Sequence, residues 1–382
     1  MTLQYLLPVA LILSACSVQS QSQKGPVPAV VEVPSRESQV QFETYVDGLD
    51  EPWGFVFTGD DHMLITEKKG DLRIFADGKL IGTPVANIPT VNSGGQGGLM
   101  DVALDPDYPD NKWVYLSFSH PLEGSSGPSM TKIVRGRIVN GAWISGQTLF
   151  QADSEDYVDT GFHYGSRITF DDAGRLYFSI GDRGLKEQAQ DLSLPNGKVH
   201  RINRDGSIPE DNPFVGQENA APTIYSYGNR NPQGLIWHPA SGELWSTEHG
   251  PRGGDELNLI ESGKNYGWPD ISYGINYNGT ILTEYTALPG MEQPASHWTP
   301  SIAVCGLDVY TGDMFPEWKG RLLVGSLAYE SLRLVEVKDG KYLGESEILK
   351  AEGRIRDVTT GPDGAIYVAL PDSIIRMTPA VD

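Results

Sequence analysis

The chain has 382 residues, of which 39% are hydrophobic, and its 50 acidic and 29 basic side chains give a formal net charge of −21. A chain of this length can bury a sizeable core, and its charge argues against nucleic-acid binding, which needs clustered Lys and Arg to neutralise phosphates. The excess of acid is typical of a solvated surface and is also compatible with affinity for cations.

The N-terminus has the pattern of an export signal followed by a tether. The apolar run "LPVALILSA" ends in small residues directly before Cys16 and is too short to span a bilayer. "LSAC" resembles the lipobox of bacterial lipoproteins, which predicts a lipoprotein signal over residues 1–16 with Cys16 as the lipid acceptor. A plain secretory signal is the alternative, since "MTLQY" lacks Lys and Arg. Residues 17–38, rich in Ser, Gln, Pro and Val, are predicted to form a flexible tether.

This leader predicts an exported, periplasmic protein that meets the membrane only through the lipid on Cys16. Cys305 is the other of the two cysteines, so no disulfide is expected within the mature chain.

Six similar phrases follow, each a turn containing Asp or Gly and then a short alternating strand. Their β-branched and aromatic residues at period two predict strands, and long helical periodicity is almost absent. Repeats of roughly 40 to 50 residues predict an all-β fold, a six-bladed β-propeller with four-stranded blades, over residues 39–382. A pair of β-sandwiches with similar turns is the alternative. The phrases are "TGDDHMLITE" (58–67), "DPDYPDNKWVYLSFS" (105–119), "FDDAGRLYFSIGD" (170–182), "HPASGELWSTEHG" (238–250), "FPEWKGRLLVGSL" (315–327) and "GPDGAIYVALPD" (361–372).

Loops at one end of a propeller converge on its channel, so a site is expected as scattered motifs beside the repeated strands. In "NSGGQGGLMD" (92–101) the glycines allow close backbone approach and Gln96 offers a donor and an acceptor; a flexible loop is the alternative. In "GFHYGSRI" (161–168) the imidazole of His163 can remove a proton at neutral pH, or it is a structural histidine. No histidine pair has the spacing of a zinc site.

Two further motifs carry arginine. "YGNRNPQG" (227–234) places Arg230 and Asn231 on a turn, where a guanidinium offers a fork of donors to carboxylate or carbonyl oxygens; pairing with one of the many acids is the alternative. In "GRIRD" (353–357) strand geometry would point Arg354 and Arg356 the same way, toward a polycarboxylate ligand or toward neighbouring acids.

The loop "EHGPRGGDELNLIESGKNYGWP" (248–269) is rich in oxygen ligands. Gly250 and Pro251 are candidates to present main-chain carbonyls to a hard cation, with Asp255 and Glu256 adding charge. The pattern predicts a calcium site; an ordinary surface turn looks similar. Trp298 could line a sugar site or fill a blade interface.

These five motifs, in this order, resemble the glucose/sorbosone dehydrogenases, which use pyrroloquinoline quinone (PQQ) on a six-bladed propeller. The likeness is closest to the periplasmic aldose sugar dehydrogenases within that family and covers nearly the whole mature chain. It implies that His163 is the general base and that Arg230, with calcium, polarises the quinone. It also implies quinone contacts from Gln96, Arg230, Asn231, Tyr277, Arg354 and Arg356.

The resemblance also implies two calcium ions. The carbonyls of Gly250 and Pro251 would hold the ion that binds the quinone. A second, structural ion would lie at Glu256 and the carbonyl of Tyr266.

Two departures from the family pattern concern the cofactor and the substrate. Ala328 in "GSLAYESL" stands where family members often carry a lysine that contacts the quinone, and Arg333 is a candidate substitute. Phe162 stands where the soluble glucose dehydrogenases place an acid, which leaves the sugar substrate open.

The expected activity is oxidation of an aldose at the anomeric carbon to a lactone, with PQQ as hydride acceptor and an external acceptor for the electrons. A calcium-dependent propeller hydrolase or lactonase and a non-catalytic sugar-binding propeller are the alternatives. A homodimer stays open.

Overall fold

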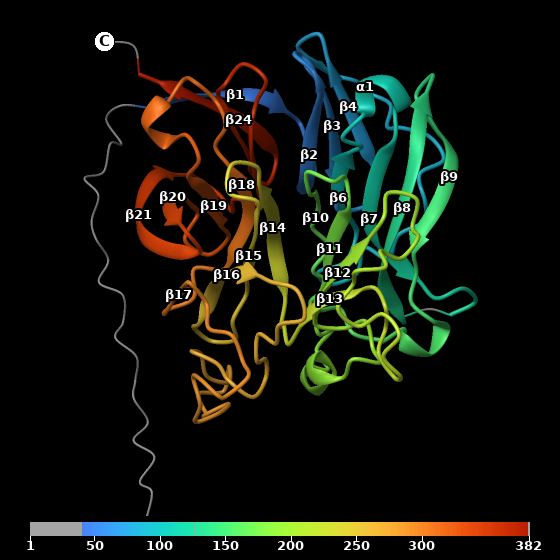
Figure 1. The fold of residues 1–382 in the computed structure, drawn as a ribbon. Helices are drawn as coiled ribbons and strands as arrows, with labels where there is room; N and C mark the ends of the chain where they lie inside the picture. Colours follow the sequence, from blue (N-terminus) through green and yellow to red (C-terminus); the bar gives the residue numbers. More distant parts are fainter. Residues whose placement is uncertain (1–39, 126, 381–382) are drawn as a thin grey trace, which may run out of the picture.

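The computed structural model describes residues 40–125 and 127–380, and its strands form six four-stranded antiparallel sheets arranged as the blades of a propeller (Figure 1). The predicted all-β fold is therefore confirmed. Cys16 and the expected tether lie outside the described residues.

The first four blades follow the chain in order. The first contains β2 (Pro52–Gly59), β3 (His62–Glu67), β4 (Leu72–Ala76) and β5 (Lys79–Leu80). The second contains β6 (Leu99–Leu104), β7 (Val114–Pro121), β8 (Ser129–Val139) and β9 (Ala142–Phe150). The third contains β10 (Ile168–Phe170), β11 (Leu176–Ile180), β12 (Lys198–Ile202) and β13 (Ile224–Tyr227). The fourth contains β14 (Pro232–His238), β15 (Glu243–Glu248), β16 (Asp255–Ile260) and β17 (Ser296–Trp298).

The last two blades include the closure of the ring. The fifth contains β18 (Val304–Val309), β19 (Leu322–Ser326), β20 (Ser331–Lys338) and β21 (Lys341–Lys350). The sixth contains β22 (Asp357–Thr360), β23 (Ile366–Ala369), β24 (Ser373–Pro379) and, as its outermost strand, β1 (Val40–Asp47) from the start of the propeller. β1 pairs antiparallel with β24 from Val40↔Pro379 to Asp47↔Ser373, and Figure 1 shows the blue strand beside the red one.

Helical structure in the described residues is limited to short pieces, namely α1 (Tyr108–Asn111) and the 3₁₀ turns at Ser154–Asp156, Lys186–Gln190 and Pro316–Trp318. None of them has the length and apolar character needed to cross a membrane.

All six repeated phrases coincide with the second strand of a blade and the turn that leads into it. The third phrase shows the local cause: Asp171 Oδ1 accepts hydrogen bonds from the N–H groups of Ala173 and Arg175, while Gly174 takes the left-handed conformation with φ 73°. The turn chemistry therefore marks the return from the channel-lining first strand to the second strand.

The hydrophobic core is divided among the blade interfaces. The first strands of neighbouring blades contact one another around the ring, and six clusters of buried side chains each join one blade to the next. Trp298 belongs to the cluster between the fourth and fifth blades, where its indole N–H donates to Glu345. Trp298 is therefore an interface residue, and the sugar-site alternative for it is wrong.

Candidate active site

The predicted site residues meet where the first strands begin. Gln96 precedes β6, His163 precedes β10 and Arg230 precedes β14. The Gln96 side-chain carbonyl accepts a hydrogen bond of 2.8 Å from the His163 N–H, and the Asp182 N–H donates to the Arg230 carbonyl at 2.7 Å. Loops from three blades are thus joined at one end of the channel.

His163 and Asp182 form a hydrogen-bonded pair. The imidazole Nδ1 lies 2.6 Å from Asp182 Oδ1, while the other carboxylate oxygen accepts a 2.8 Å bond from the indole N–H of Trp268. The Gly184 N–H also donates to Oδ1, at 2.7 Å. With its carboxylate held on both oxygens, Asp182 fixes the orientation of the imidazole ring.

The pKa values of the pair favour a neutral base beside an ionised acid. Burial lowers the pKa of His163, which the hydrogen bond to Asp182 opposes and the charge of Arg230 reinforces. Burial acts to raise the pKa of Asp182, but the hydrogen bond from His163 and the imidazole charge outweigh it and the pKa is lowered. Near neutral pH the proton therefore lies on Nδ1, and Nε2 is free to accept another.

A glycine permits the approach of these loops. A Cβ at Gly181 would lie 3.0 Å from the Arg230 carbonyl and closer still to the carbonyl of His163. Gly181 and Asp182 directly follow β11. The third repeated phrase therefore supplies both the glycine that lets the loops approach and the carboxylate that binds His163.

Arg230 is buried and forms no direct ion pair in the described residues, although its charge lowers the pKa of Asp182 and opposes the rise in that of Glu248. Its Nη1 donates to the His249 carbonyl at 3.0 Å and its Nη2 to the Tyr277 hydroxyl at 3.3 Å, whereas Nε has no hydrogen-bond partner in the part of the chain described. No ion pair to Arg230 is formed within the described residues. The alternative that it pairs with a surplus acid is not realised, and a buried guanidinium with an orphaned donor suits an anionic ligand.

Asn231 and Tyr277 take different positions. Asn231 is buried, and its side-chain carbonyl accepts hydrogen bonds from the Gly165 N–H at 3.2 Å and from Gln233 at 3.3 Å, so it braces the loop that follows His163. Tyr277 is 71% exposed and holds Arg230 through its hydroxyl alone. Its ring is therefore available at the mouth of the site.

Arg354 and Arg356 differ in their contacts with the protein. Arg356 donates to Gln233 Oε1 at 3.3 Å and lies 3.6 Å from the sulfur of Cys305, near the channel axis. Arg354 is exposed and makes no side-chain hydrogen bond or ion pair within residues 40–125 and 127–380, and Ile355 between them is buried. Only Arg356 is thus connected to the rest of the site.

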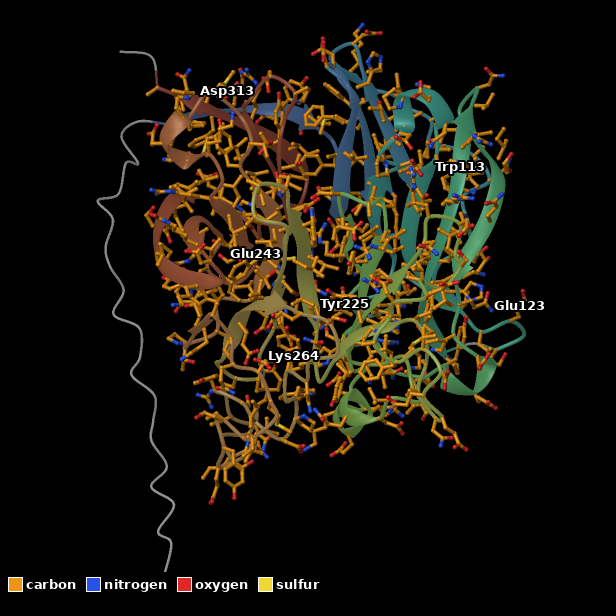
Figure 2. All side chains as sticks on the ribbon, in the orientation of Figure 1. Trp113, Glu123, Tyr225, Glu243, Lys264 and Asp313 are labelled. Carbon is orange, nitrogen blue, oxygen red and sulfur yellow. The ribbon has the colours of Figure 1, made fainter. Side chains whose placement is uncertain are left out.

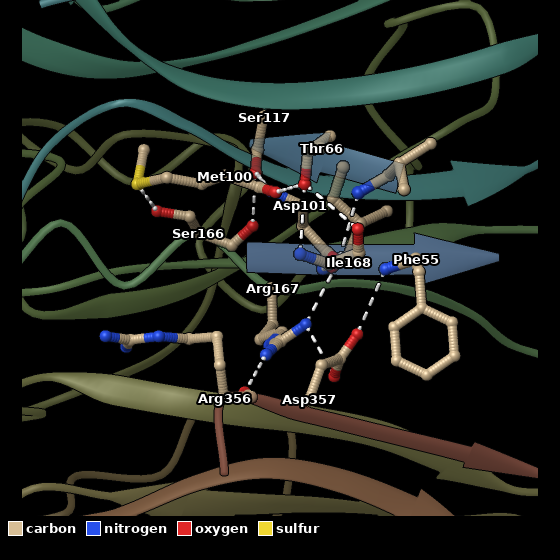
Figure 3. A network of polar contacts seen from close by, with 12 residues as sticks. Phe55, Thr66, Met100, Asp101, Ser117, Ser166, Arg167, Ile168, Arg356 and Asp357 are labelled. Carbon is tan, nitrogen blue, oxygen red and sulfur yellow. Dashed lines mark hydrogen bonds and ion pairs between the residues drawn. The ribbon is translucent and has the colours of Figure 1, made fainter. Parts of the chain in front are cut away.

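A buried network of ion pairs and hydrogen bonds surrounds Arg167, and it was not predicted from the sequence (Figure 3). Arg167 forms ion pairs with Asp101 at 3.2 Å and with Asp357 at 2.9 Å, and its guanidinium stacks 4.2 Å from the Trp53 ring centroid.

The same side chain also holds main-chain groups. Arg167 donates to the carbonyl of Gln233 at 2.9 Å and to the carbonyl of Arg356 at 2.8 Å. One arginine of the third blade therefore ties together the first, second, fourth and sixth, and it fixes the backbone that carries Arg356. The only sequence signal is an Arg directly before a strand in "GSRI".

The predicted metal-binding residues line one small cavity of about 10 Å³. It contains all four of them, Gly250, Pro251, Glu256 and Tyr266, together with Arg230, Glu248 and His249. Asp255 instead accepts bonds from the Gly250 N–H at 3.0 Å and the Ser301 hydroxyl at 2.6 Å, which shapes the loop.

Two carboxylates in this cavity destabilise each other's charge. Burial raises the pKa of Glu248 to about 7, and burial together with the charge of Glu248 raises the pKa of Glu256 to about 8. No cluster of three or more His, Cys, Asp or Glu suited to a metal occurs in the part of the chain described, so a cation here would need main-chain carbonyls as well. No role for Glu248 was predicted from the sequence.

Arg333 does not replace the lysine that family members often carry at the position of Ala328. That guanidinium forms ion pairs with Glu345 at 2.6 Å and Glu347 at 3.6 Å. The expectation that Arg333 takes over the contact of the lysine replaced by Ala328 is therefore wrong.

Comparison with known proteins agrees with the observed fold. The family model for glucose/sorbosone dehydrogenases matches residues 49–375. The aldose sugar dehydrogenase YliI of Escherichia coli K12 is 40% identical over 349 residues, covering 89% of this chain and 93% of the relative. The crystal structure of the soluble E. coli aldose sugar dehydrogenase in its apo-form has a TM-score of 0.84 at 38% identity, covering 89% of this chain and 100% of that one. The PQQ-bound aldose sugar dehydrogenase of Streptomyces coelicolor has a TM-score of 0.72 at 25% identity, covering 89% and 98%.

Proposed function

This chain belongs to the glucose/sorbosone dehydrogenase family of oxidoreductases, and we propose that it oxidises aldose sugars at the anomeric carbon to lactones with PQQ as cofactor. One observation carries the proposal. The buried guanidinium of Arg230, which forms no ion pair within the described residues, is near enough to lower the pKa of a neutral His163 that Asp182 holds.

The residues present fit PQQ, a planar tricarboxylate. The orphaned Nε of Arg230 and the cation of Arg356 supply positive charge at the channel end, and Tyr277 offers an exposed ring beside Arg230. The S. coelicolor relative binds PQQ, which supports the same cofactor here.

The small cavity fits a calcium ion. Glu248 and Glu256 provide two carboxylates whose mutual repulsion a divalent cation would remove, and Gly250, Pro251 and Tyr266 add main-chain carbonyls. We propose that Ca²⁺ binds there and adds to the positive field around Arg230.

His163 would act as the general base. Its Nε2 would take the proton of the anomeric hydroxyl while Asp182 keeps the other nitrogen protonated and stabilises the imidazolium that forms. The Arg230 guanidinium would stabilise negative charge that develops nearby. When bound, PQQ would accept the two electrons as a hydride from the same carbon, and an external acceptor would later receive them.

Phe162, directly before His163, is 55% exposed. An apolar ring at the mouth cannot accept sugar hydroxyl hydrogen bonds as a carboxylate would, so we expect recognition by stacking and a broad choice of aldoses.

Reconstitution of the purified protein tests the proposal. PQQ and CaCl₂ are titrated into the apoprotein while absorbance is recorded, and reduction of an artificial dye is then measured with D-glucose and other aldoses. His163→Ala should keep the absorbance change and lose turnover by about 10²- to 10⁴-fold, with exposed His62→Ala as the matched control.

The other outcomes point elsewhere. Turnover of a lactone with CaCl₂ alone would indicate a hydrolase, and sugar binding without dye reduction would indicate a non-catalytic propeller. Wild-type rates in His163→Ala would contradict the assignment of the base.

A further inference from the structure

A second and larger cavity lies outside the candidate active site. It has a volume of about 540 Å³ and is formed by one face of β7, β8 and β9, with Pro89 and Thr90 from the segment before β6 as its opposite wall. Glu123 on its rim is seen in Figure 2 at the outer edge of the second blade, far from the centre of the ring. The volume is that of a typical small-molecule pocket.

The floor of this cavity is apolar. Phe118, Val134 and Trp143 line it, and all three belong to the buried cluster between the first and second blades. Lys132 pairs directly with Phe118 across the two strands. Directly opposed residues of an antiparallel pair lie on the same face of the sheet, so the Lys132 side chain lies on the apolar face that carries Phe118.

Lys132 is a half-buried cation without a partner. It forms no ion pair and no side-chain hydrogen bond with the residues that the structure describes, in a chain with a formal charge of −21. Burial lowers the pKa of Lys132, and Glu123 only partly offsets this through its charge, without an ion pair. A cation left in this state is stabilised by an anion that enters the cavity.

The tryptophan offers a second unpaired donor. The indole N–H of Trp143 has no hydrogen-bond partner in the described chain, and it is left uncovered because the adjacent lining residue is Gly146. A Cβ at Gly146 would lie 3.1 Å from that nitrogen. His120, also in the lining, shares a hydrogen bond of 2.7 Å between Nδ1 and the Tyr157 hydroxyl, and its Nε2 has no hydrogen bond within the described residues.

We infer that this cavity binds a small ring-bearing carboxylate. The ring lies over Phe118 and Val134, the carboxylate pairs with the Lys132 ammonium, and the Trp143 N–H donates the further hydrogen bond. The inference does not depend on sugar oxidation, because no residue of the candidate active site lines the cavity.

The test measures binding of 2-naphthoate to the full chain by isothermal titration calorimetry, with the uncharged 2-naphthamide as a probe of matched shape. The naphthoate should bind about tenfold more tightly than the amide, as one partly buried ion pair is worth about 1.4 kcal/mol. Lys132→Met should lose that preference, and Gly146→Ala should weaken both probes. Lys341→Met, which removes an exposed lysine from the fifth blade, is the control and should change nothing.

Arg356→Met separates this cavity from the channel site. Binding that persists in Arg356→Met and falls in Lys132→Met supports the inference. Equal affinity for the two probes, or an affinity for naphthoate that Lys132→Met leaves unchanged, overturns it. The comparison of probes on the wild-type chain stands even if a variant folds poorly.

Discussion

Nδ1 of His163 lies 2.6 Å from Oδ1 of Asp182, and the second oxygen of that carboxylate is held by the indole of Trp268. The carboxylate comes from the end of one repeated strand and the indole from a long loop of the next blade. The tautomer of the base is therefore set by groups that are remote in sequence.

Asp182→Asn tests this arrangement. The amide keeps the shape of the side chain but can donate to Nδ1, which would leave Nε2 protonated and unable to accept the substrate proton. We expect kcat to fall about 10²- to 10⁴-fold while the PQQ titration is unchanged. Asp172→Asn, which changes an exposed carboxylate of the same repeated phrase, is the control and should leave kcat unchanged. A normal kcat in Asp182→Asn would show that the pair only supports the fold.

The pH profile follows from the lowered pKa of His163. A base works in its neutral form, so activity should be constant above its pKa and should fall as pH decreases through it. Because burial lowers this pKa, the midpoint of the fall in kcat/KM should lie below the ordinary value of 6.5. In Arg230→Met the histidine loses a nearby positive charge, so an NMR titration of His163 should give a higher pKa than in the wild type. A midpoint above pH 7 in the wild-type profile would contradict the prediction that His163 is a base with a lowered pKa.

Calcium should stabilise the fold through Glu248 and Glu256. At about a hundred times its dissociation constant, a ligand that binds only the native state adds about 2.7 kcal/mol to the free energy of unfolding. CaCl₂ should therefore raise Tm, and EGTA should reverse the rise. Glu256→Gln should abolish the calcium response. Above pH 8, where the Glu256 carboxyl is ionised, it should also raise Tm of the calcium-free protein, since one of two repelling buried charges is removed. Glu243→Gln is the control, because Glu243 begins β15 and Glu248 ends it. An equal calcium response in both variants would place the ion elsewhere.

Arg167→Met should be costly, because it leaves Asp101 and Asp357 buried without their cation. Removing one partner of a buried network costs about 3–5 kcal/mol, whereas an exposed ion pair such as Arg321–Glu336 is worth about 0–1 kcal/mol. Urea unfolding of Arg167→Met and Arg321→Met measures the difference. Asp357→Asn added to Arg167→Met should restore part of the loss, and a purely additive effect would show that the charges are not coupled.

The repeated strands were predictable from the sequence because their turns are local. An Asp that accepts hydrogen bonds from the N–H groups two and four residues later, with a left-handed glycine between them, is recognisable in "DDAGR" whatever the fold around it. The other strands of the blades gave weaker signals. β10 and β17 have three residues each, which is too short for a periodic pattern.

Sequence reasoning found only those site residues that stand in a recognisable loop motif. His163, Arg230 and Gly250 stand in glycine-rich loops, whereas Asp182 and Glu248 lie at the ends of the repeated strands, inside phrases that had already been explained as structural. Asp182 and Glu248 could both have been predicted from one pattern, an acidic residue at the end of the second strand of a blade. Pairing across the ring, such as Arg167 with Asp357, depends on closure of the propeller and has no local trace.

The pairing of β1 with β24 bears on how the protein is made. Arg376 donates to Glu43 across 333 positions of sequence, and among the described strands β1 is hydrogen-bonded to β24 alone. During synthesis β1 stays without its strand partner until β24 has left the ribosome. Five blades can therefore form before the ring closes, and a chain that stops before β24 would keep a bare strand edge open to aggregation.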